Sequence, residues 1–184
     1  MKIIFIDRDG VINKDPGGWT EHSYVTSWKD FHFLPGAKES LKKLTEAGYE
    51  IIIISNQAGV NRGYFTQNDL RDINENMLKE IYSSGGRVHS TYYCPHTKDE
   101  GCDCRKPKTG LFKKATEDLD VDFKGTFFIG DGSMDVEAGK RIGCRTILLL
   151  SGKSKLEDVE GWICKPDYIK KDLLEAVDWI LSER

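Results

Sequence analysis

Acidic side chains, a hydroxyl and a lysine follow short apolar runs of this 184-residue sequence. In chain order these residues are Asp7, Asp9, Ser55, Lys106, Asp131 and Asp135. A phosphoryl group needs cations to offset its charge and donors aimed at its oxygens, and Lys106 and the Ser55 hydroxyl can supply both. Repeated carboxylates would repel a phosphate unless a divalent cation lies among them. The set therefore predicts phosphoryl chemistry with a bound Mg²⁺, an ion that prefers oxygen ligands.

The carboxylates divide into two predicted roles. Asp7 can attack phosphorus and form an aspartyl-phosphate, a known form of nucleophilic catalysis by a carboxylate. Asp9 projects to the same side as Asp7 if the strand geometry continues, so it can protonate the leaving oxygen and then activate water. The expected Mg²⁺ ligands are Asp7, Asp9 through its backbone carbonyl, and Asp131. Asp135 is expected to support the site, either as a ligand or by orienting Asp131.

Each of these residues also has an ordinary structural interpretation. A single Asp after a strand is more often a helix N-cap or a turn residue than a nucleophile. Ser55 and Asn56 fit a turn, and Lys106 alone fits a solvated surface charge. Asp131 and Asp135 would complement the dipole at a helix start. Their joint placement after successive apolar runs favours the functional interpretation.

Alternating apolar runs and helical patterns predict the scaffold that brings these residues together. Strands are expected at Lys2–Ile6, Tyr49–Ile54, Val88–Tyr93, Thr126–Ile129 and Arg145–Leu150. Helices are expected at Gly36–Ala47, Thr66–Ser83, Gly110–Leu119, Ser133–Ile142 and Tyr168–Leu181. This alternation predicts an α/β fold with a doubly wound, mostly parallel sheet. Ligands bind such sheets at the carboxyl ends of the strands, where the residues above would meet.

The composition is that of an ordinary globular chain, with 39% hydrophobic and 31% charged residues. Its length predicts one domain over residues 1–184. A net charge of −3 argues against nucleic-acid binding, and no apolar run is long enough for a transmembrane helix, so no membrane association is expected. The apolar start at residues 1–6 is too short for a signal peptide, which predicts a cytoplasmic protein. A monomer is the default expectation.

Three cysteines and one histidine gather within eleven residues, at Cys94, His96, Cys102 and Cys104. This Cys₃His set suits tetrahedral zinc, and it leaves no open ligand position, so a structural site is expected. A disulfide is the alternative, which the close spacing of two of the thiols and a reducing cytoplasm disfavour. The zinc loop 94–107 would fix Arg105 and Lys106. Arg105 offers a planar fork for a second phosphate or for sugar hydroxyls, with a solvated loop cation as its ordinary interpretation.

The acidic motifs resemble those of the haloacid dehalogenase superfamily of phosphatases. The matching residues, in order along the chain, are Asp7-Arg8-Asp9-Gly10, Ser55, Lys106 and Gly130-Asp131-x-x-x-Asp135. The resemblance implies a Rossmann-like fold, an Asp nucleophile, an Asp acid/base and a Mg²⁺ site. Cap domains are common in this superfamily, but only 47 residues separate Asp7 from Ser55, and they already include a helix. We therefore expect a capless, open site shaped by loops such as Asp15–Trp28.

The zinc loop narrows the resemblance to one branch of the superfamily. Cys-Pro-His followed by Cys-x-Cys-Arg-Lys-Pro is similar to the branch of heptose bisphosphate phosphatases and histidinol-phosphate phosphatases. Arg62-Gly63 resembles the heptose enzymes, whereas the short spacing from His96 to Cys102 resembles the histidinol enzymes. Both imply a small phosphorylated metabolite as substrate. The candidate substrate contacts are Ser55, Asn56, Gln57, Arg105, Lys106 and Asp15.

Two alternatives belong to other classes of protein. A signalling receiver domain also carries a phosphoryl group on an Asp at a strand end, but Asp9 and the zinc loop argue against it. A zinc-stabilised binding module without catalysis would be expected to lack one of the acids. None of them is missing from this sequence.

Overall fold

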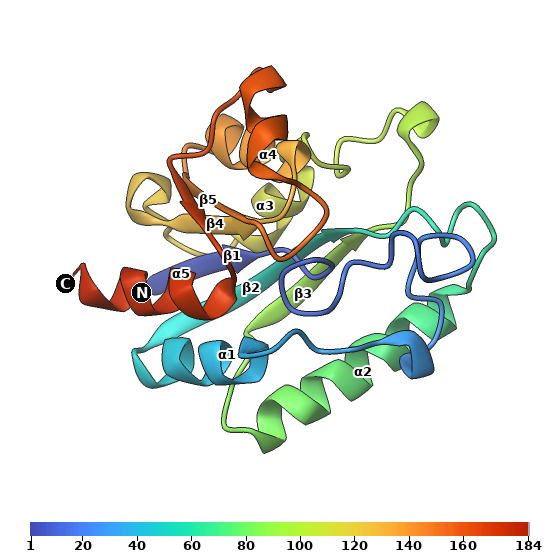
Figure 1. The fold of residues 1–184 in the computed structure, drawn as a ribbon, viewed down its shortest axis with the longest axis horizontal. Coiled ribbons are helices and arrows are strands. Elements are labelled where there is room, and N and C mark those ends of the chain that lie inside the picture. The colour runs from blue at the N-terminus through green and yellow to red at the C-terminus, as the bar shows by residue number, and fades with distance from the viewer. Residues whose placement is uncertain (184) are drawn as a thin grey trace.

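The computed structural model describes residues 1–183 and contains a six-stranded sheet between two layers of helices (Figure 1). Its strands are β1 (Lys2–Ile6), β2 (Tyr49–Asn56), β3 (Ser90–Cys94), β4 (Phe127–Gly130), β5 (Arg145–Leu149) and β6 (Tyr168–Lys170). They lie in the order β3-β2-β1-β4-β5-β6, and every neighbouring pair is parallel. The predicted doubly wound parallel fold is therefore confirmed.

Helices cover both faces of the sheet. They are α1 (Ala37–Glu46), α2 (Gln67–Ser83), α3 (Gly110–Ala115), α4 (Ser133–Ile142) and α5 (Leu173–Ser182). Leu41 of α1 and Val177 of α5 pack with α2 on the face that includes Ile4. On the opposite face, Phe112 of α3 packs with α4 against Phe5. Because both faces are buried, the central strands are continuous apolar runs rather than alternating ones.

The predicted helix at residues 168–181 is partly wrong. Residues 168–181 were expected to be helical throughout, but Tyr168–Lys170 forms the edge strand β6, which pairs with β5. The side chain of Ile169 packs against a small apolar cluster beside β5. The helix begins only after Asp172, whose carboxylate accepts a hydrogen bond from the Glu175 backbone N–H at 2.9 Å. Asp172 is thus the N-cap that separates strand from helix.

The sheet order places a topological switch point between β1 and β4. From β1 the chain moves outward to β2 and β3, and from β4 it moves to β5 and β6 on the other side. A crevice forms at the carboxyl ends of strands at such a point. Residues 8–36, which run from β1 to α1 past this edge, contain one short 3₁₀ turn at Trp28–Asp30 and no inserted helical or sheet layer. This agrees with the expectation of a site without a cap, whereas the single-domain organisation stays a prediction. Among residues 1–183, no helix has the length and apolar content needed to cross a bilayer.

Candidate active site

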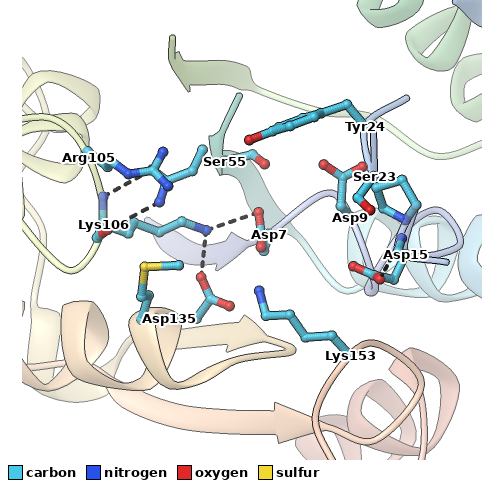
Figure 2. A pocket seen from close by; sticks show the side chains of 14 residues that line it. Asp7, Asp9, Asp15, Ser23, Tyr24, Ser55, Arg105, Lys106, Asp135 and Lys153 are labelled. Carbon is cyan, nitrogen blue, oxygen red and sulfur yellow. Dashed lines mark hydrogen bonds and ion pairs between the residues drawn. The ribbon is translucent and has the colours of Figure 1, made fainter. Parts of the chain in front are cut away.

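A cavity of about 380 Å³ opens at the carboxyl ends of β1 and β2 (Figure 2). Eight of its lining residues were predicted as site residues from the sequence alone and contribute charges or donors: Asp7, Asp9, Asp15, Ser55, Asn56, Arg105, Lys106 and Asp135. Asp7 follows β1 directly, and its backbone N–H donates to the Ile129 carbonyl at 2.9 Å, which ties it to β4. The switch point therefore brings together residues that lie far apart in the chain.

Lys106 is the cation at the centre of the site. Its ammonium lies 3.0 Å from Asp7 Oδ1 and 2.6 Å from Asp135 Oδ1, and it donates to the Ile54 carbonyl at 2.9 Å. The side chain is only 2% exposed. The two carboxylates outweigh the effect of burial, which alone would lower the pKa of Lys106, and they raise it. Lys106 is therefore a fixed positive charge beside the predicted nucleophile.

Asp7, Asp131 and Asp135 form a buried cluster of carboxylates. One oxygen from each lies within 4.8 Å of the others. Burial and the neighbouring carboxylates raise the pKa of Asp131 to about 7, against the effect of Lys153. Burial also raises the pKa of Asp7, although Lys106 opposes the shift. Oδ1 of Asp131 is buried and has no hydrogen-bond partner among the described residues. A divalent cation would offset the repulsion among these carboxylate oxygens and would give Asp131 Oδ1 a partner. The residues therefore fit Mg²⁺.

Asp135 holds two parts of the site together. One of its oxygens pairs with Lys106, and Oδ2 accepts hydrogen bonds from the backbone N–H groups of Asp131 and Gly132, at 3.3 and 3.1 Å. Burial would raise the pKa of Asp135, but Lys106 and Lys153 keep it below its ordinary value. Asp135 is thus an ionised residue that fixes the start of α4 and the position of Lys106.

Asp9 is surrounded by donors. Arg8 pairs with Oδ1 at 2.9 Å, the Asn13 amide donates to the same oxygen at 2.9 Å, and Gln57 donates to Oδ2 at 2.7 Å. Burial would raise the pKa of Asp9, but these partners together hold it below its ordinary value. The backbone carbonyl of Asp9 accepts no hydrogen bond from residues 1–183, so it is available as a metal ligand.

Glycines allow the backbone to approach Asp131 closely. A Cβ on Gly10 would lie 2.2 Å from Asp131 Oδ2, and a Cβ on Gly152 would lie at the same distance from that atom. Gly10 also has a φ of +78°, a conformation that costs little only for glycine. The space around Asp131 therefore depends on two residues without side chains.

The residues at the end of β2 divide between the cavity and the protein interior. Ser55 Oγ accepts a hydrogen bond from the Gln57 amide at 3.2 Å, which leaves its O–H free to donate into the cavity. The Asn56 amide exchanges hydrogen bonds with the backbone N–H and carbonyl of Lys106, at 3.0 and 3.2 Å. Gln57 is fully buried and does not line the cavity. Substrate contact by Asn56 and Gln57 stays a prediction. In the structure, Asn56 makes hydrogen bonds to Lys106, and Gln57 donates to Asp9 and Ser55.

Arg105 and Asp15 lie at the cavity mouth. One guanidinium nitrogen of Arg105 donates to the His96 carbonyl at 3.1 Å, so the zinc loop orients this side chain. Asp15 accepts a hydrogen bond from the Gly17 N–H at 2.9 Å, which shapes the loop that forms one wall. Both residues line the cavity as expected.

Several residues near the site were not singled out from the sequence, and four of them carry charge or bulky side chains. Tyr24, Met134 and Lys153 line the cavity, and Arg8 lies fully buried behind Asp9. Lys153 carries a signal in the sequence, because it follows the predicted strand Arg145–Leu150 at the same edge of the sheet. Tyr24 lies in the loop Asp15–Trp28 that was expected to shape the site, but no pattern sets it apart within that loop. Arg8 and Met134 carry no such signal.

The four predicted zinc ligands converge. The Cys94 and Cys104 sulfurs lie 3.1 Å apart, and Cys102 Sγ lies 3.7 and 3.5 Å from them. His96 Nδ1 lies 3.5 Å from Cys94 Sγ and 3.2 Å from Cys104 Sγ. Zinc–sulfur bonds of about 2.3 Å give a tetrahedron with edges of about 3.8 Å, close to this spacing. All of these cysteines are free thiols rather than disulfides, so the donor set and its size fit zinc.

A parallel sheet with Asp7, Ser55, Lys106 and Asp131 at its switch point is the arrangement of haloacid dehalogenase-like hydrolases, and residues 103–176 match the family model described as HAD-hydrolase-like. The D-glycero-beta-D-manno-heptose-1,7-bisphosphate 7-phosphatase of Helicobacter pylori (strain J99) is 37% identical over 97% of this chain and 97% of its own length. The D-glycero-alpha-D-manno-heptose-1,7-bisphosphate 7-phosphatase of Campylobacter jejuni is 38% identical over 85% of this chain and 87% of its own.

A solved structure agrees over the whole chain. The crystal structure of D,D-heptose 1,7-bisphosphate phosphatase from Bordetella bronchiseptica, complexed with magnesium and phosphate, has a TM-score of 0.92 and 32% identity over 100% of both chains. The chain therefore belongs to the haloacid dehalogenase-like hydrolases, in the family of the D-glycero-D-manno-heptose-1,7-bisphosphate 7-phosphatases.

Proposed function

We propose that this chain is a Mg²⁺-dependent phosphatase that hydrolyses D-glycero-D-manno-heptose 1,7-bisphosphate at the 7-phosphate. The observation that carries the proposal is the buried Asp7 carboxylate, 3.0 Å from the Lys106 ammonium at the switch point of the sheet. The identity of the substrate is inferred from the relatives, because they are named for this reaction and align with nearly the whole chain.

In the first half-reaction Asp7 is the nucleophile. One of its carboxylate oxygens forms a bond to phosphorus while the bond from phosphorus to the sugar oxygen breaks. Asp9 gives its proton to the leaving oxygen, which releases heptose 1-phosphate and leaves an aspartyl-phosphate. Lys106 and the Ser55 hydroxyl bind phosphoryl oxygens and offset the charge that they carry.

In the second half-reaction water attacks the phosphorus of the aspartyl-phosphate. Asp9, now ionised, takes a proton from that water, and the phosphoryl group leaves Asp7 as inorganic phosphate. The donors around Asp9, above all Arg8, favour the ionised form that this step requires. Asp7 returns to its starting carboxylate.

Two metal sites complete the proposal. Asp7, the Asp9 carbonyl and Asp131 would hold Mg²⁺, which when bound offsets the charge of the carboxylates and the phosphoryl oxygens. Cys94, His96, Cys102 and Cys104 would hold a structural Zn²⁺. Zinc would keep Arg105 at the cavity mouth, where its fork can bind the 1-phosphate or sugar hydroxyls. We also propose that residues 1–184 work as one domain and as a monomer in the cytoplasm, where thiols stay reduced.

The test is a phosphate-release assay with and without Mg²⁺. It compares kcat/KM for both anomers of heptose 1,7-bisphosphate and for histidinol phosphate. We expect a preference of about a hundredfold for a heptose anomer, which corresponds to about 2.7 kcal/mol of differential transition-state binding. A preference for histidinol phosphate would contradict the proposed substrate but not the proposed phosphatase mechanism. Asp7→Asn is the control for the chemistry, because release by this variant would remove Asp7 as the nucleophile.

A further inference from the structure

Lys153 is a cation of the cavity that the proposed reaction leaves without a role. It lies in the loop after β5 and lines the cavity together with Asp7 and Lys106. Figure 2 shows its amino end directed toward Asp7 and Asp135, from the side opposite Ser55. Its backbone N–H donates to Asp131 Oδ2 at 2.9 Å. The residue is therefore anchored at its backbone to a site carboxylate, while its side chain reaches into the cavity.

The neighbouring glycine makes room for this side chain. A Cβ on Gly132 would lie 2.5 Å from Cε and 2.9 Å from Nζ of Lys153. A side chain at position 132, the residue that follows Asp131, would therefore displace the ammonium. The space that the end of the Lys153 side chain occupies therefore exists because residue 132 has no side chain.

The ammonium of Lys153 has unused donors, in contrast to that of Lys106. Lys106 is 2% exposed and has close partners in Asp7, Asp135 and the Ile54 carbonyl. Lys153 has a side chain that is 47% exposed, and its Nζ makes one charge pair, at 3.5 Å from Asp131 Oδ1. Its Nζ donates no hydrogen bond to a residue within 1–183 and has only this charge pair. An ammonium carries three donors, so Lys153 can bind another acceptor in the cavity.

The charges around the site indicate what that acceptor is. Asp7, Asp131 and Asp135 form a negative cluster that Lys106 and Lys153 offset only in part. A divalent cation on Asp7 and Asp131 would give Asp131 a stronger partner than an ammonium, and the cluster with its two lysines would become positive. The acceptor that suits a positive cavity with a free ammonium is an anionic phosphoryl group.

We propose, on the basis of the function proposed above, that Lys153 is a second phosphate-binding residue, which rests on Asp131 in the metal-free protein and binds a phosphoryl oxygen once a divalent cation is present. The proposal requires only a side-chain rotation, because the backbone of Lys153 stays bound to Asp131 Oδ2.

Calorimetric titrations of the full chain test this role without turnover. Inorganic phosphate is titrated into protein saturated with Mg²⁺, for wild type, Lys153→Gln, Lys153→Arg and Lys155→Gln. Lys155 is the matched control, since it is an exposed lysine of the same loop that does not line the cavity. We expect Lys153→Gln to weaken phosphate binding by about tenfold or more, the effect of losing one charged hydrogen bond. Lys153→Arg should stay within about threefold of wild type, and Lys155→Gln should match it.

A second titration, of Mg²⁺ without phosphate, separates a specific effect from a general one. Lys153→Gln should bind Mg²⁺ more tightly than wild type and than Lys155→Gln, because the competing ammonium on Asp131 is gone. Unchanged phosphate affinity in Lys153→Gln, or an equal loss in Lys155→Gln, would overturn the inference. Failure of the wild type itself to bind phosphate with Mg²⁺ would overturn the proposed function as well. If phosphate binding shows the expected pattern but the heptose bisphosphate is not hydrolysed, only the proposed substrate would be contradicted.

Discussion

The surroundings of Asp9 fit one half of its proposed role more directly than the other. Arg8, Asn13 and Gln57 hold its pKa below the ordinary value, so the resting side chain is a carboxylate. A carboxylate accepts the proton of the attacking water at once. Protonation of the leaving oxygen requires that Asp9 first take up a proton, which these partners disfavour because they stabilise the carboxylate. The first half-reaction is therefore the step whose rate should depend most on Asp9.

Asp9→Asn should accordingly slow turnover in a way that depends on the leaving group. Sugar alkoxides leave poorly without a proton, so we expect a loss of about 10²- to 10⁴-fold in kcat/KM for the heptose substrate. Aryl phosphates, whose leaving groups need no proton, should lose less than about tenfold. The measurement is kcat/KM over a leaving-group series. A uniform loss across the series would instead assign Asp9 to ordering the metal site.

Gly10 gives a test of how tightly Asp131 is packed. Gly10→Ala would place a Cβ 2.2 Å from Asp131 Oδ2, whereas Gly48 has a similar φ, +77° against +78°, and open space around it. Both alanine variants should lose about 1–2 kcal/mol of unfolding free energy from the left-handed backbone. Only Gly10→Ala should also lose affinity for Mg²⁺, measured by calorimetry. Equal Mg²⁺ affinity in the two variants would show that Asp131 can move aside.

At the scale of single residues, the sequence predicts the charged and polar site residues that directly follow strands. It does not predict the site residues whose position depends on the path of a loop. Asp7, Ser55 and Asp131 could be predicted because a parallel sheet brings its strand ends to one edge. Tyr24 could not, because it reaches the cavity through the path of the loop that begins at Asp15. Gln57 was predicted to contact substrate, but the direction of its buried amide depends on Asp9 and Ser55. Side-chain direction is a tertiary property that spacing does not contain.

The zinc loop is the element that connects two sites. Cys94 ends β3, and the loop returns through Cys104 to Arg105 and Lys106. Cys104→Ser should remove zinc from the protein, and it should lower both the melting temperature and kcat/KM, because Lys106 then loses its fixed approach to Asp7. Metal analysis of the purified protein checks the first outcome. Cys164→Ser is the control, since Cys164 lies outside the cluster and should leave the zinc content unchanged.

The edge strand β6 shows why one element was misassigned. Apolar residues in 168–181 continue at helical spacing, so the periodicity does not mark a boundary between strand and helix. Asp172 was the available signal, an Asp that caps the helix from within the predicted range. The predicted helix at Gly110–Leu119 similarly ends early, at Ala115. Boundaries of short elements depend on caps and packing more than on hydrophobic pattern.

Asp167, just before β6, gives a pH-dependent test of this edge. Its carboxylate accepts hydrogen bonds from the Thr146 backbone N–H and hydroxyl, at 2.7 and 2.9 Å, and pairs with Lys140. Burial opposes ionisation, but Lys140 and Thr146 hold the pKa of Asp167 below its ordinary value. A lowered pKa means that the contribution to stability is present above the unfolded pKa and is lost as pH falls through the folded one.

We expect Asp167→Asn to lose about 1 kcal/mol of unfolding free energy at pH 7, a modest value because the carboxylate is partly exposed and screened. The difference from wild type should be constant above about pH 5 and shrink below about pH 4. Urea unfolding at several pH values measures it. Asp178→Asn, at a more exposed carboxylate that pairs with Lys43, is the control and should show a smaller effect. A loss for Asp167→Asn that did not vary with pH would mean that packing, not charge, holds the edge.

At the scale of the whole molecule, the site depends on the order of the strands. The alternation of elements predicted a parallel sheet, but the order β3-β2-β1-β4-β5-β6 was not part of that prediction. It places β1 beside β4, and so brings Asp7 close to Asp131 although their residue numbers differ by 124. The same convergence concentrates negative charge in the interior, where a cation would relieve it. Folding and metal binding should therefore be coupled.

This coupling predicts a rise in melting temperature on addition of Mg²⁺. A ligand at a hundred times its Kd adds about 2.7 kcal/mol to the stability, which for a chain of this size raises Tm by roughly 5 to 10 °C. Asp131→Asn should abolish the rise, because it removes a proposed ligand. In EDTA the same variant should melt no lower than wild type, since a carboxylate whose pKa is raised to about 7 by burial and by neighbouring acids is itself destabilising when ionised. Asp118→Asn, at an exposed residue outside the cluster, should keep the full rise. A full rise in the Tm of Asp131→Asn on addition of Mg²⁺ would mean that the ion binds elsewhere. A lower Tm of that variant than of wild type in EDTA would mean that the charge pair between Asp131 and Lys153 outweighs the repulsion among the carboxylates.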